Sequence, residues 1–90
     1  MYEIEYTERA RQDFELLHKH DPSAFKKALQ LILELMEHPT TGTGHPEQLK
    51  GDRAGQWIRR ISKKHRLVYE IHEQQVIVLV LTAYGHYDDK

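Results

Sequence analysis

The sequence contains no cysteine and no long apolar run, and each absence excludes a class of protein. Without cysteine among its 90 residues, the chain has neither disulfides nor thiolate ligands for zinc. The longest apolar run, residues 76–81, is far shorter than the ~20 residues that a helix needs to cross a bilayer. The first five residues are acidic and alternate in polarity, unlike the basic and apolar start of a signal peptide. We therefore expect a cytoplasmic protein without a membrane contact.

Glycine and proline are also scarce, and this limits the domain organisation. The five glycines and three prolines form no linker, internal repeat or phosphate-binding glycine motif. The hydrophobic share of 39% and the charged share of 30% are typical of a soluble globular chain. Folding at this length removes roughly 60–70% of the unfolded surface from water, enough for one core. We expect a single domain over residues 1–90.

The net charge of −1 conceals a strong segregation of charge along the chain. From Lys50 to Arg66 there are seven basic residues and one acid, Asp52. This stretch carries +6, so the remaining residues together carry −7. Such segregation favours a polyanion-binding face on an acidic body, although a solvated charged hairpin gives the same pattern.

The first half of the sequence predicts a strand and two helices. Tyr2 to Tyr6 alternate in polarity, as in a strand with one buried face. Thr7 can cap a first helix, in which Ala10, Phe14 and Leu17 form the predicted apolar stripe and Asp13 is placed off it. Asp21 and Pro22 start the second helix, because aspartate caps free amides and proline suits the first helical position. Apolar residues then recur at spacings of three and four along the second helix, which His38-Pro39 is expected to end.

The second half predicts a loop and then a group of strands. Residues 40–46 form the loop, with Gly42 and Gly44 supplying flexible backbone. Extended segments are predicted over residues 47–50, 57–62, 65–72 and 76–84. Two-residue turns are predicted between the last three of them.

Helices grouped early and strands grouped late indicate an α+β fold. We expect two N-terminal helices packed on one face of a twisted antiparallel sheet. Alternation along residues 65–72 places Leu67, Tyr69 and Ile71 on one side of the sheet and Arg66 on the other. If the apolar set meets the helices, Arg66 lies on the open face, where a ligand can reach it.

Cleavage of RNA without a metal is a chemistry that the polar residues of the second half can carry. It needs a base for the ribose 2′-hydroxyl proton, an acid for the leaving 5′-oxygen, and cations for the charge that develops on phosphorus. The candidates for these tasks are Glu47, Lys50, Arg59, Arg60, Arg66, His86 and Tyr87. The other histidines, among them His45 and His65, show no spacing typical of metal ligands, so we expect no metal and no cofactor.

Four motifs of the second half resemble YoeB-like toxins of the RelE superfamily, in order and in spacing. They are GTGHPEQLK at residues 42–50, WIRRI at 57–61, HRLVY at 65–69 and GHY at 85–87. The first half resembles the family only in its pattern. The resemblance implies a RelE-like fold and the toxin half of a type II toxin–antitoxin pair. It also implies a ribosome-dependent endoribonuclease that cuts messenger RNA in the A site without a metal.

The resemblance implies a role for each candidate residue. Glu47 matches the general base, His86 the general acid, and Arg66 the arginine that stabilises the transition state. We assign substrate binding to the cations Lys50, Arg59 and Arg60, and Tyr87 matches a terminal tyrosine that helps to hold the substrate.

The resemblance further implies partners. A YefM-like antitoxin is expected to fold an acidic segment over Arg59, Arg60 and Arg66. The ribosome with its messenger RNA is the expected target. A homodimer is also expected, and an exposed Trp57 would suit its interface.

Other interpretations of the same residues stay open. Glu47 could be a surface carboxylate paired with Lys50, Arg66 a solvated cation, and Trp57 a core residue. The acidic residues Asp88 and Asp89 depart from the family pattern and are unfavourable beside a phosphate. The alternative functions are a ParE-like toxin that inhibits DNA gyrase without catalysis, and an inactive relative that binds RNA with steep salt dependence.

Overall fold

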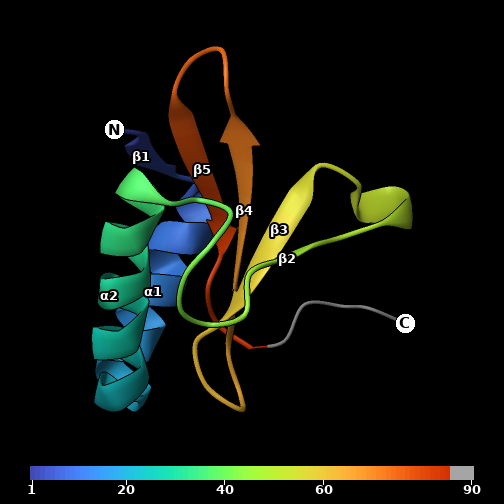
Figure 1. Cartoon of the computed structure of the whole chain (residues 1–90). Helices are drawn as coiled ribbons and strands as arrows, with labels where there is room; N and C mark the ends of the chain where they lie inside the picture. Colours follow the sequence, from blue (N-terminus) through green and yellow to red (C-terminus); the bar gives the residue numbers. More distant parts are fainter. Residues whose placement is uncertain (86–90) are drawn as a thin grey trace.

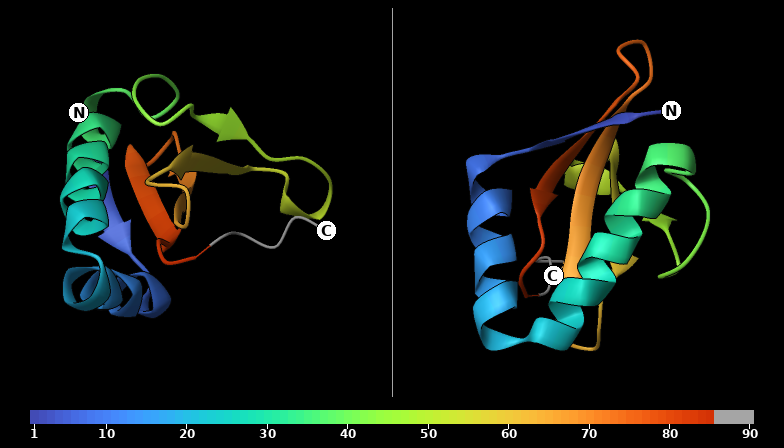
Figure 2. Two further views of the ribbon diagram at one scale, coloured as in Figure 1. Left: turned by 90° about the horizontal axis from the view of Figure 1, so that it is seen from below. Right: turned by 90° about the vertical axis from the view of Figure 1, so that its left-hand side faces the viewer.

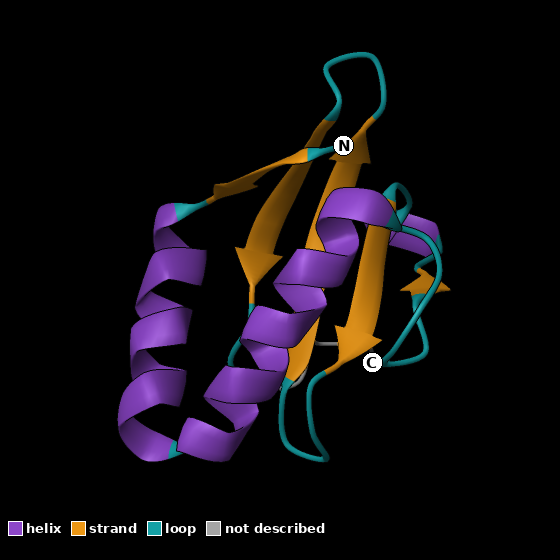
Figure 3. Ribbon diagram, turned by 60° about the vertical axis from the view of Figure 1, so that its left-hand side comes forward, coloured by secondary structure: helices purple, strands orange, loops and turns teal. Residues whose placement is uncertain are grey.

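Two helices cover one face of a five-stranded sheet in the computed structural model, which describes residues 1–85 (Figure 1). The chain begins with strand β1 (Glu3–Tyr6) and continues through helices α1 (Glu8–His20) and α2 (Pro22–Glu37). The later elements are β2 (Glu47–Gln48), the 3-10 turn η1 (Gly51–Arg53), β3 (Gln56–Arg60), β4 (Arg66–His72) and β5 (Ile77–Thr82). The predicted α+β fold, with both helices on one face, is confirmed (Figure 3).

The strands lie in the order β1-β5-β4-β3-β2, and one pair differs from the prediction. The β2–β3, β3–β4 and β4–β5 pairs are antiparallel, whereas β1 lies parallel to β5, with Glu3 opposite Ile77. The prediction of a wholly antiparallel sheet is therefore wrong at this edge. Short connections force antiparallel pairing on the late strands, but two helices separate β1 from the rest and leave its direction free.

Local hydrogen bonds fix the starts of both helices as predicted. The Thr7 hydroxyl oxygen accepts from the Ala10 amide at 3.0 Å, and the Asp21 carboxylate accepts from the Ala24 amide at 3.2 Å. Thr7 also donates to the Leu81 carbonyl at 2.8 Å. The cap of α1 therefore ties this helix to the end of β5.

The core lies between the helices and the sheet. Leu17, Leu31 and Leu35 of the helices are fully buried against Leu67 and Tyr69 of β4. The predicted inward direction of Leu67 and Tyr69 is confirmed, and Ile71 packs against the same cluster. A smaller cluster lies apart from it and consists of Leu49, Ile58, Val68 and Leu81. One face of the sheet therefore stays free of helices (Figure 2).

Asp13 was predicted to lie off the buried stripe of α1, and this is wrong. Its side chain is buried, and its carboxylate accepts from the amides of Ala83 at 2.9 Å and Tyr84 at 3.3 Å. The residue lies three positions after Ala10 and four before Leu17, so helix geometry puts it on the same face as both. Asp13 thus anchors the segment that follows β5.

The connections between the late strands are longer than the two-residue turns predicted. Residues 61–65 join β3 to β4, and residues 73–76 join β4 to β5. Val76 has a φ of +57°, which a β-branched side chain adopts only under strain. Within residues 1–85, no helix is both long and apolar enough to span a membrane.

Substitution of Val76 by asparagine is expected to stabilise the protein by roughly 1 kcal/mol, because asparagine tolerates positive φ. The Val76 side chain is 44% exposed, so little packing is lost. Urea denaturation followed by circular dichroism measures the change. The variant Gln75→Asn, at the neighbouring exposed position, serves as the control, and equal stability of the two variants would show that Val76 is not strained.

Candidate functional site

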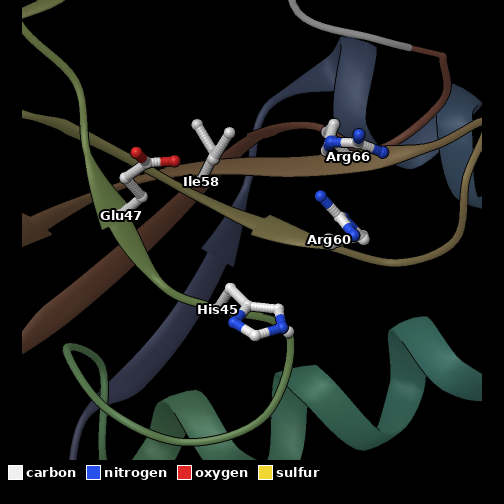
Figure 4. A pocket seen from close by; sticks show the side chains of 6 residues that line it. His45, Glu47, Ile58, Arg60 and Arg66 are labelled. Carbon is white, nitrogen blue, oxygen red and sulfur yellow. The ribbon is translucent and has the colours of Figure 1, made fainter.

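A small pocket opens on the helix-free face of the sheet, where β2, β3 and β4 meet (Figure 4). It is lined by Gly44, His45, Glu47, Ile58, Arg60 and Arg66. In the close-up, Ile58 lies between Glu47 and Arg66, and Arg60 lies between His45 and Arg66. Three of the predicted site residues, Glu47, Arg60 and Arg66, therefore share one pocket.

Strand register explains why these side chains meet. Glu47 pairs with Ile58, and Arg60 pairs with Arg66. Directly opposite residues have side chains on the same face, about 4.5–5.5 Å apart at Cβ. Ile58 and Arg60 are two positions apart on β3, so they also share that face. The pocket follows from the pairing of three strands.

The two arginines give the pocket an excess of positive charge over the single carboxylate, Glu47, that lines it. Like charges on opposite strand positions repel each other. The Arg66 guanidinium donates to the carbonyls of Ser62 at 2.7 Å and His65 at 3.2 Å, which hold the side chain but do not neutralise it. Within residues 1–85, no carboxylate forms an ion pair with Arg60 or Arg66. The pocket is therefore suited to an anion such as a phosphate.

Lys50 lies near this pocket in sequence but does not line it. The residue is exposed and immediately precedes η1, three positions after Glu47. No ion pair joins Lys50 to Glu47 in the described part of the chain, so the surface-pair interpretation of Glu47 finds no support. Among residues 1–85, no group of three or more histidine, aspartate or glutamate side chains is arranged to hold a metal ion.

Arg59 was predicted to bind substrate beside Arg60, and the structure corrects this. Its side chain is 0% exposed and lies on the other side of β3 from Arg60, because successive strand residues point to opposite faces. The Arg59 guanidinium donates to Glu34 at 2.9 Å and to the Tyr69 hydroxyl at 3.2 Å. A side chain so enclosed has no surface to offer a substrate.

The buried guanidinium instead organises the loop before β2. It donates to the carbonyls of His38, Thr41 and Thr43. The Tyr69 hydroxyl donates to the Pro39 carbonyl at 2.7 Å, and burial raises the pKa of this phenol, which stays neutral. Arg59 thus satisfies loop carbonyls that regular secondary structure would otherwise satisfy.

Two glycines let this loop approach β3 closely. Gly42 has a φ of +116°, and a Cβ there would lie 2.5 Å from a carboxylate oxygen of Glu34. Gly44 has a φ of +88°, and a Cβ there would lie 2.9 Å from the Arg60 carbonyl. The Arg60 amide donates to the Gly44 carbonyl at 2.7 Å. The sequence predicted that these glycines make the loop flexible. In the structure they instead allow close contacts that a side chain would prevent.

Glu34 of α2 is not among the predicted site residues, yet it joins the hydrogen bonds that Arg59 makes with the loop before β2. Its carboxylate accepts from the Thr43 hydroxyl at 2.6 Å, the Thr43 amide at 2.8 Å and the Arg59 guanidinium. The Thr43 hydrogen bond, followed by the Thr43 amide and Arg59, lowers the pKa of Glu34 below its usual value. No motif in the sequence links a helical glutamate to a glycine-containing loop eight positions later, so this contact could not be predicted.

This lowered pKa predicts a pH-dependent contribution to stability. The charged form is favoured in the folded state, so the stabilisation is present above the unfolded pKa of glutamate and is lost as pH falls through the folded value. Glu34→Gln should therefore lower the unfolding free energy by about 1–2 kcal/mol near pH 7 and by much less near pH 3. Denaturation at both pH values measures this, with the exposed Glu37→Gln as control. An equal loss at both pH values would contradict the role of the charge.

Trp57 is not the exposed side chain that was expected for a dimer contact. It is half-buried and packs against the core between helices and sheet. Trp57 and Arg59 are two positions apart on β3 and therefore share its helix-facing side. This agrees with the alternative interpretation of Trp57 as a packing residue, and its partly exposed surface leaves a dimer contact open.

The end of the described chain is held beside Arg66. The Gly85 amide donates to Nδ1 of His65 at 2.8 Å, and the Arg66 amide donates to the Gly85 carbonyl at 2.9 Å. The Tyr84 ring packs on the His65 ring, with centroids 4.6 Å apart. The candidates His86 and Tyr87 and the acidic residues Asp88 and Asp89 lie outside the described residues, and their assignments stay predictions.

Comparison with known proteins gives consistent matches. The family model described as "YoeB-like toxin of bacterial type II toxin-antitoxin system" matches residues 6–87. Toxin YoeB of Streptomyces coelicolor is 36% identical over 76 residues, which cover 84% of this chain and 90% of that protein. Toxin YoeB of Escherichia coli is 33% identical over 73 residues, 81% of this chain and 87% of that protein.

Solved structures extend the likeness to the fold. A YoeB/ParE toxin from Agrobacterium tumefaciens superposes with a TM-score of 0.88 at 34% identity, covering 94% of this chain and 99% of that chain. A YoeB–YefM toxin–antitoxin complex from Staphylococcus aureus, described as heterotetrameric, gives 0.82 at 27% identity, covering 97% and 99%. A YoeB dimer from the same organism gives 0.83 at 28% identity, covering 96% and 98%. The chain therefore belongs to the YoeB-like toxins of bacterial type II toxin–antitoxin systems.

Proposed function

We propose that the chain is a ribosome-dependent endoribonuclease that cuts messenger RNA in the A site by metal-independent acid–base catalysis. The observation that carries the proposal is the pocket in which an exposed carboxylate, Glu47, faces the same space as Arg60 and Arg66. A base beside an anion-binding pair is the arrangement that phosphodiester cleavage by the ribose hydroxyl needs.

The reaction divides among the chain's own residues. The Glu47 carboxylate takes the proton of the 2′-hydroxyl, whose oxygen forms a bond to phosphorus as the bond from phosphorus to the 5′-oxygen breaks. Arg66 and Arg60 stabilise the charge on the phosphoryl oxygens. His86, the predicted acid, protonates the departing 5′-oxygen. The products are a 2′,3′-cyclic phosphate and a 5′-hydroxyl end.

The anchoring of Gly85 supports the predicted role of the next residue. Gly85 is fixed by His65 and by the backbone of Arg66, so the chain reaches the start of β4 immediately before His86. The amides of this segment are held by side chains, those of Ala83 and Tyr84 by Asp13 and that of Gly85 by His65. The last described residue is therefore held beside Arg66, and this supports the proposal that His86, which follows it in the sequence, acts at the same site.

The same family membership supports proposals about partners. We infer a YefM-like antitoxin that neutralises the toxin by covering the pocket, with acidic side chains against Arg60 and Arg66. Arg59 no longer belongs to that contact, because it is buried. A homodimer is proposed from the YoeB dimer of Staphylococcus aureus. Action on ribosomes places the protein in the cytoplasm.

Mapping of messenger RNA ends on programmed ribosomes tests the proposed activity. We expect cuts within the A-site codon that leave a 2′,3′-cyclic phosphate and a 5′-hydroxyl end. Cuts that leave a 3′-hydroxyl and a 5′-phosphate, the products of attack by water, would contradict the mechanism. Intact messenger RNA together with inhibition of DNA gyrase would favour a ParE-like activity instead.

A further inference from the structure

We propose that the imidazole of His45 is a further RNA-contacting group, which binds a phosphate beside Arg60. The inference rests on the nuclease function proposed above and adds a fourth side chain to its site. His45 lines the same pocket as Glu47, Arg60 and Arg66, and in the close-up view its ring lies on the side of Arg60 that is remote from Arg66 (Figure 4). The spacing of His45 to the other histidines is not typical of metal ligands, and the sequence alone indicates no other role for it.

The backbone of His45 is held in an uncommon conformation. Its φ is +55°, and Val76 is the one other non-glycine residue with a positive φ among residues 1–85. A residue before proline normally adopts an extended backbone, and His45 precedes Pro46. A left-handed non-glycine residue is strained and persists where the surrounding structure imposes it, often at a functional site.

The surrounding structure does impose this position. On one side, the Gly44 carbonyl accepts from the Arg60 amide at 2.7 Å. On the other side, Glu47 pairs with Ile58 in the sheet. Both ends of the short Gly44–Glu47 segment are therefore fixed to β3, and the side chain of His45 stays at the pocket rim.

The charge balance of the pocket favours an anion as the ligand. The charged groups that face His45 are Glu47 of β2, Arg60 of β3 and Arg66 of β4. The His45 ring makes no hydrogen bond to another residue in the described part of the chain, so its nitrogens are available to a ligand. An imidazolium forms charge-assisted hydrogen bonds to phosphate, and imidazole is the side chain whose charge changes between pH 5 and 8. A phosphate contact of this kind is stronger in acid.

A 2′-deoxy trinucleotide is a suitable probe, because it lacks the attacking hydroxyl and stays intact. Its dissociation constant is measured by NMR titration at pH 6 and pH 8 for the natural protein, His45→Asn and His45→Lys. Asparagine tolerates positive φ and matches the backbone, while lysine keeps a cation at both pH values. We expect His45→Asn to weaken binding at pH 6 by roughly 3–10-fold relative to the natural protein, with a smaller difference at pH 8. The dissociation constants of His45→Lys at pH 6 and pH 8 should agree within about twofold, because its charge does not change.

The His45 ring signals should shift on titration of the natural protein. Equal affinity of the natural protein and His45→Asn at pH 6, or ring signals that do not move at saturation, would overturn the inference. So would the absence of any binding at millimolar trinucleotide. Because this readout needs no cleavage, His45-dependent binding with intact messenger RNA on ribosomes would refute the nuclease proposal alone. Cleavage without any effect of His45→Asn on affinity would refute the role of His45 alone.

Discussion

Glu47→Gln should lower messenger RNA cleavage on ribosomes by roughly 10²–10⁴-fold, which corresponds to about 3–5 kcal/mol of lost transition-state stabilisation. An amide cannot take the proton from the 2′-hydroxyl, so the loss falls on the chemical step. The stability should change by less than about 0.5 kcal/mol, because Glu47 is exposed and has no ion pair within residues 1–85. Single-turnover cleavage on programmed ribosomes separates this step from binding.

A matched control uses an exposed strand glutamate far from the pocket. Glu5 lies on β1, at the opposite edge of the sheet from β2, so Glu5→Gln should leave cleavage unchanged. His86→Gln should give a loss of the same order as Glu47→Gln, if histidine supplies the proton to the leaving group. Cleavage within twofold of the natural protein in both Glu47→Gln and His86→Gln would exclude the assigned base and acid.

Arg59→Met should lower the free energy of unfolding by about 3–5 kcal/mol, because the partners of a buried charge are left unsatisfied. The substitution removes hydrogen bonds to Glu34, to Tyr69 and to the loop carbonyls of His38, Thr41 and Thr43. For a domain of this size each kcal/mol corresponds to roughly 4–8 °C in Tm. Urea and thermal denaturation measure the effect, and Arg59→Lys keeps the charge if the methionine variant does not fold.

Arg60→Met is the natural comparison, since it removes the same side chain one position along β3. Arg60 is exposed on the pocket side, so its loss should change stability by less than about 0.5 kcal/mol. Cleavage should nevertheless fall, because one phosphate-binding cation is gone. Arg59→Met should therefore mainly lower stability, and Arg60→Met should mainly lower cleavage. Equal destabilisation by Arg59→Met and Arg60→Met would contradict the division of labour between the two faces of β3.

The same pair shows what the sequence can and cannot predict. Alternation along β4 predicts Arg66 on the open face, which the structure confirms, whereas the predicted substrate-binding role of both Arg59 and Arg60 disregards the same rule. Applied to β3, the rule puts Arg60 and Arg59 on opposite faces. It cannot identify the partners of Arg59 in α2 and in the loop before β2, because these lie 16 to 25 positions away. Contacts of that kind depend on tertiary structure.

Local features were predictable for the converse reason. The caps of α1 and α2 join residues three positions apart, Thr7 with Ala10 and Asp21 with Ala24, so the sequence contains both partners. Asp13 contacts amides 70 and 71 positions away, and β1 pairs with the last strand. These long-range partners have no local signature. The pocket is predictable in part. Its residues can be proposed from sequence motifs, but its shape depends on the register of the strands, which the sequence does not give.

The most direct test of the proposed active site is the structure of the protein on a ribosome whose A-site codon carries a 2′-O-methyl group, which blocks the attack. The proposed mechanism predicts a messenger RNA phosphate within hydrogen-bonding distance of Arg60 and Arg66, with the methylated oxygen facing Glu47. A messenger RNA bound on another surface, with the pocket between β2 and β4 turned away from it, would contradict the mechanism.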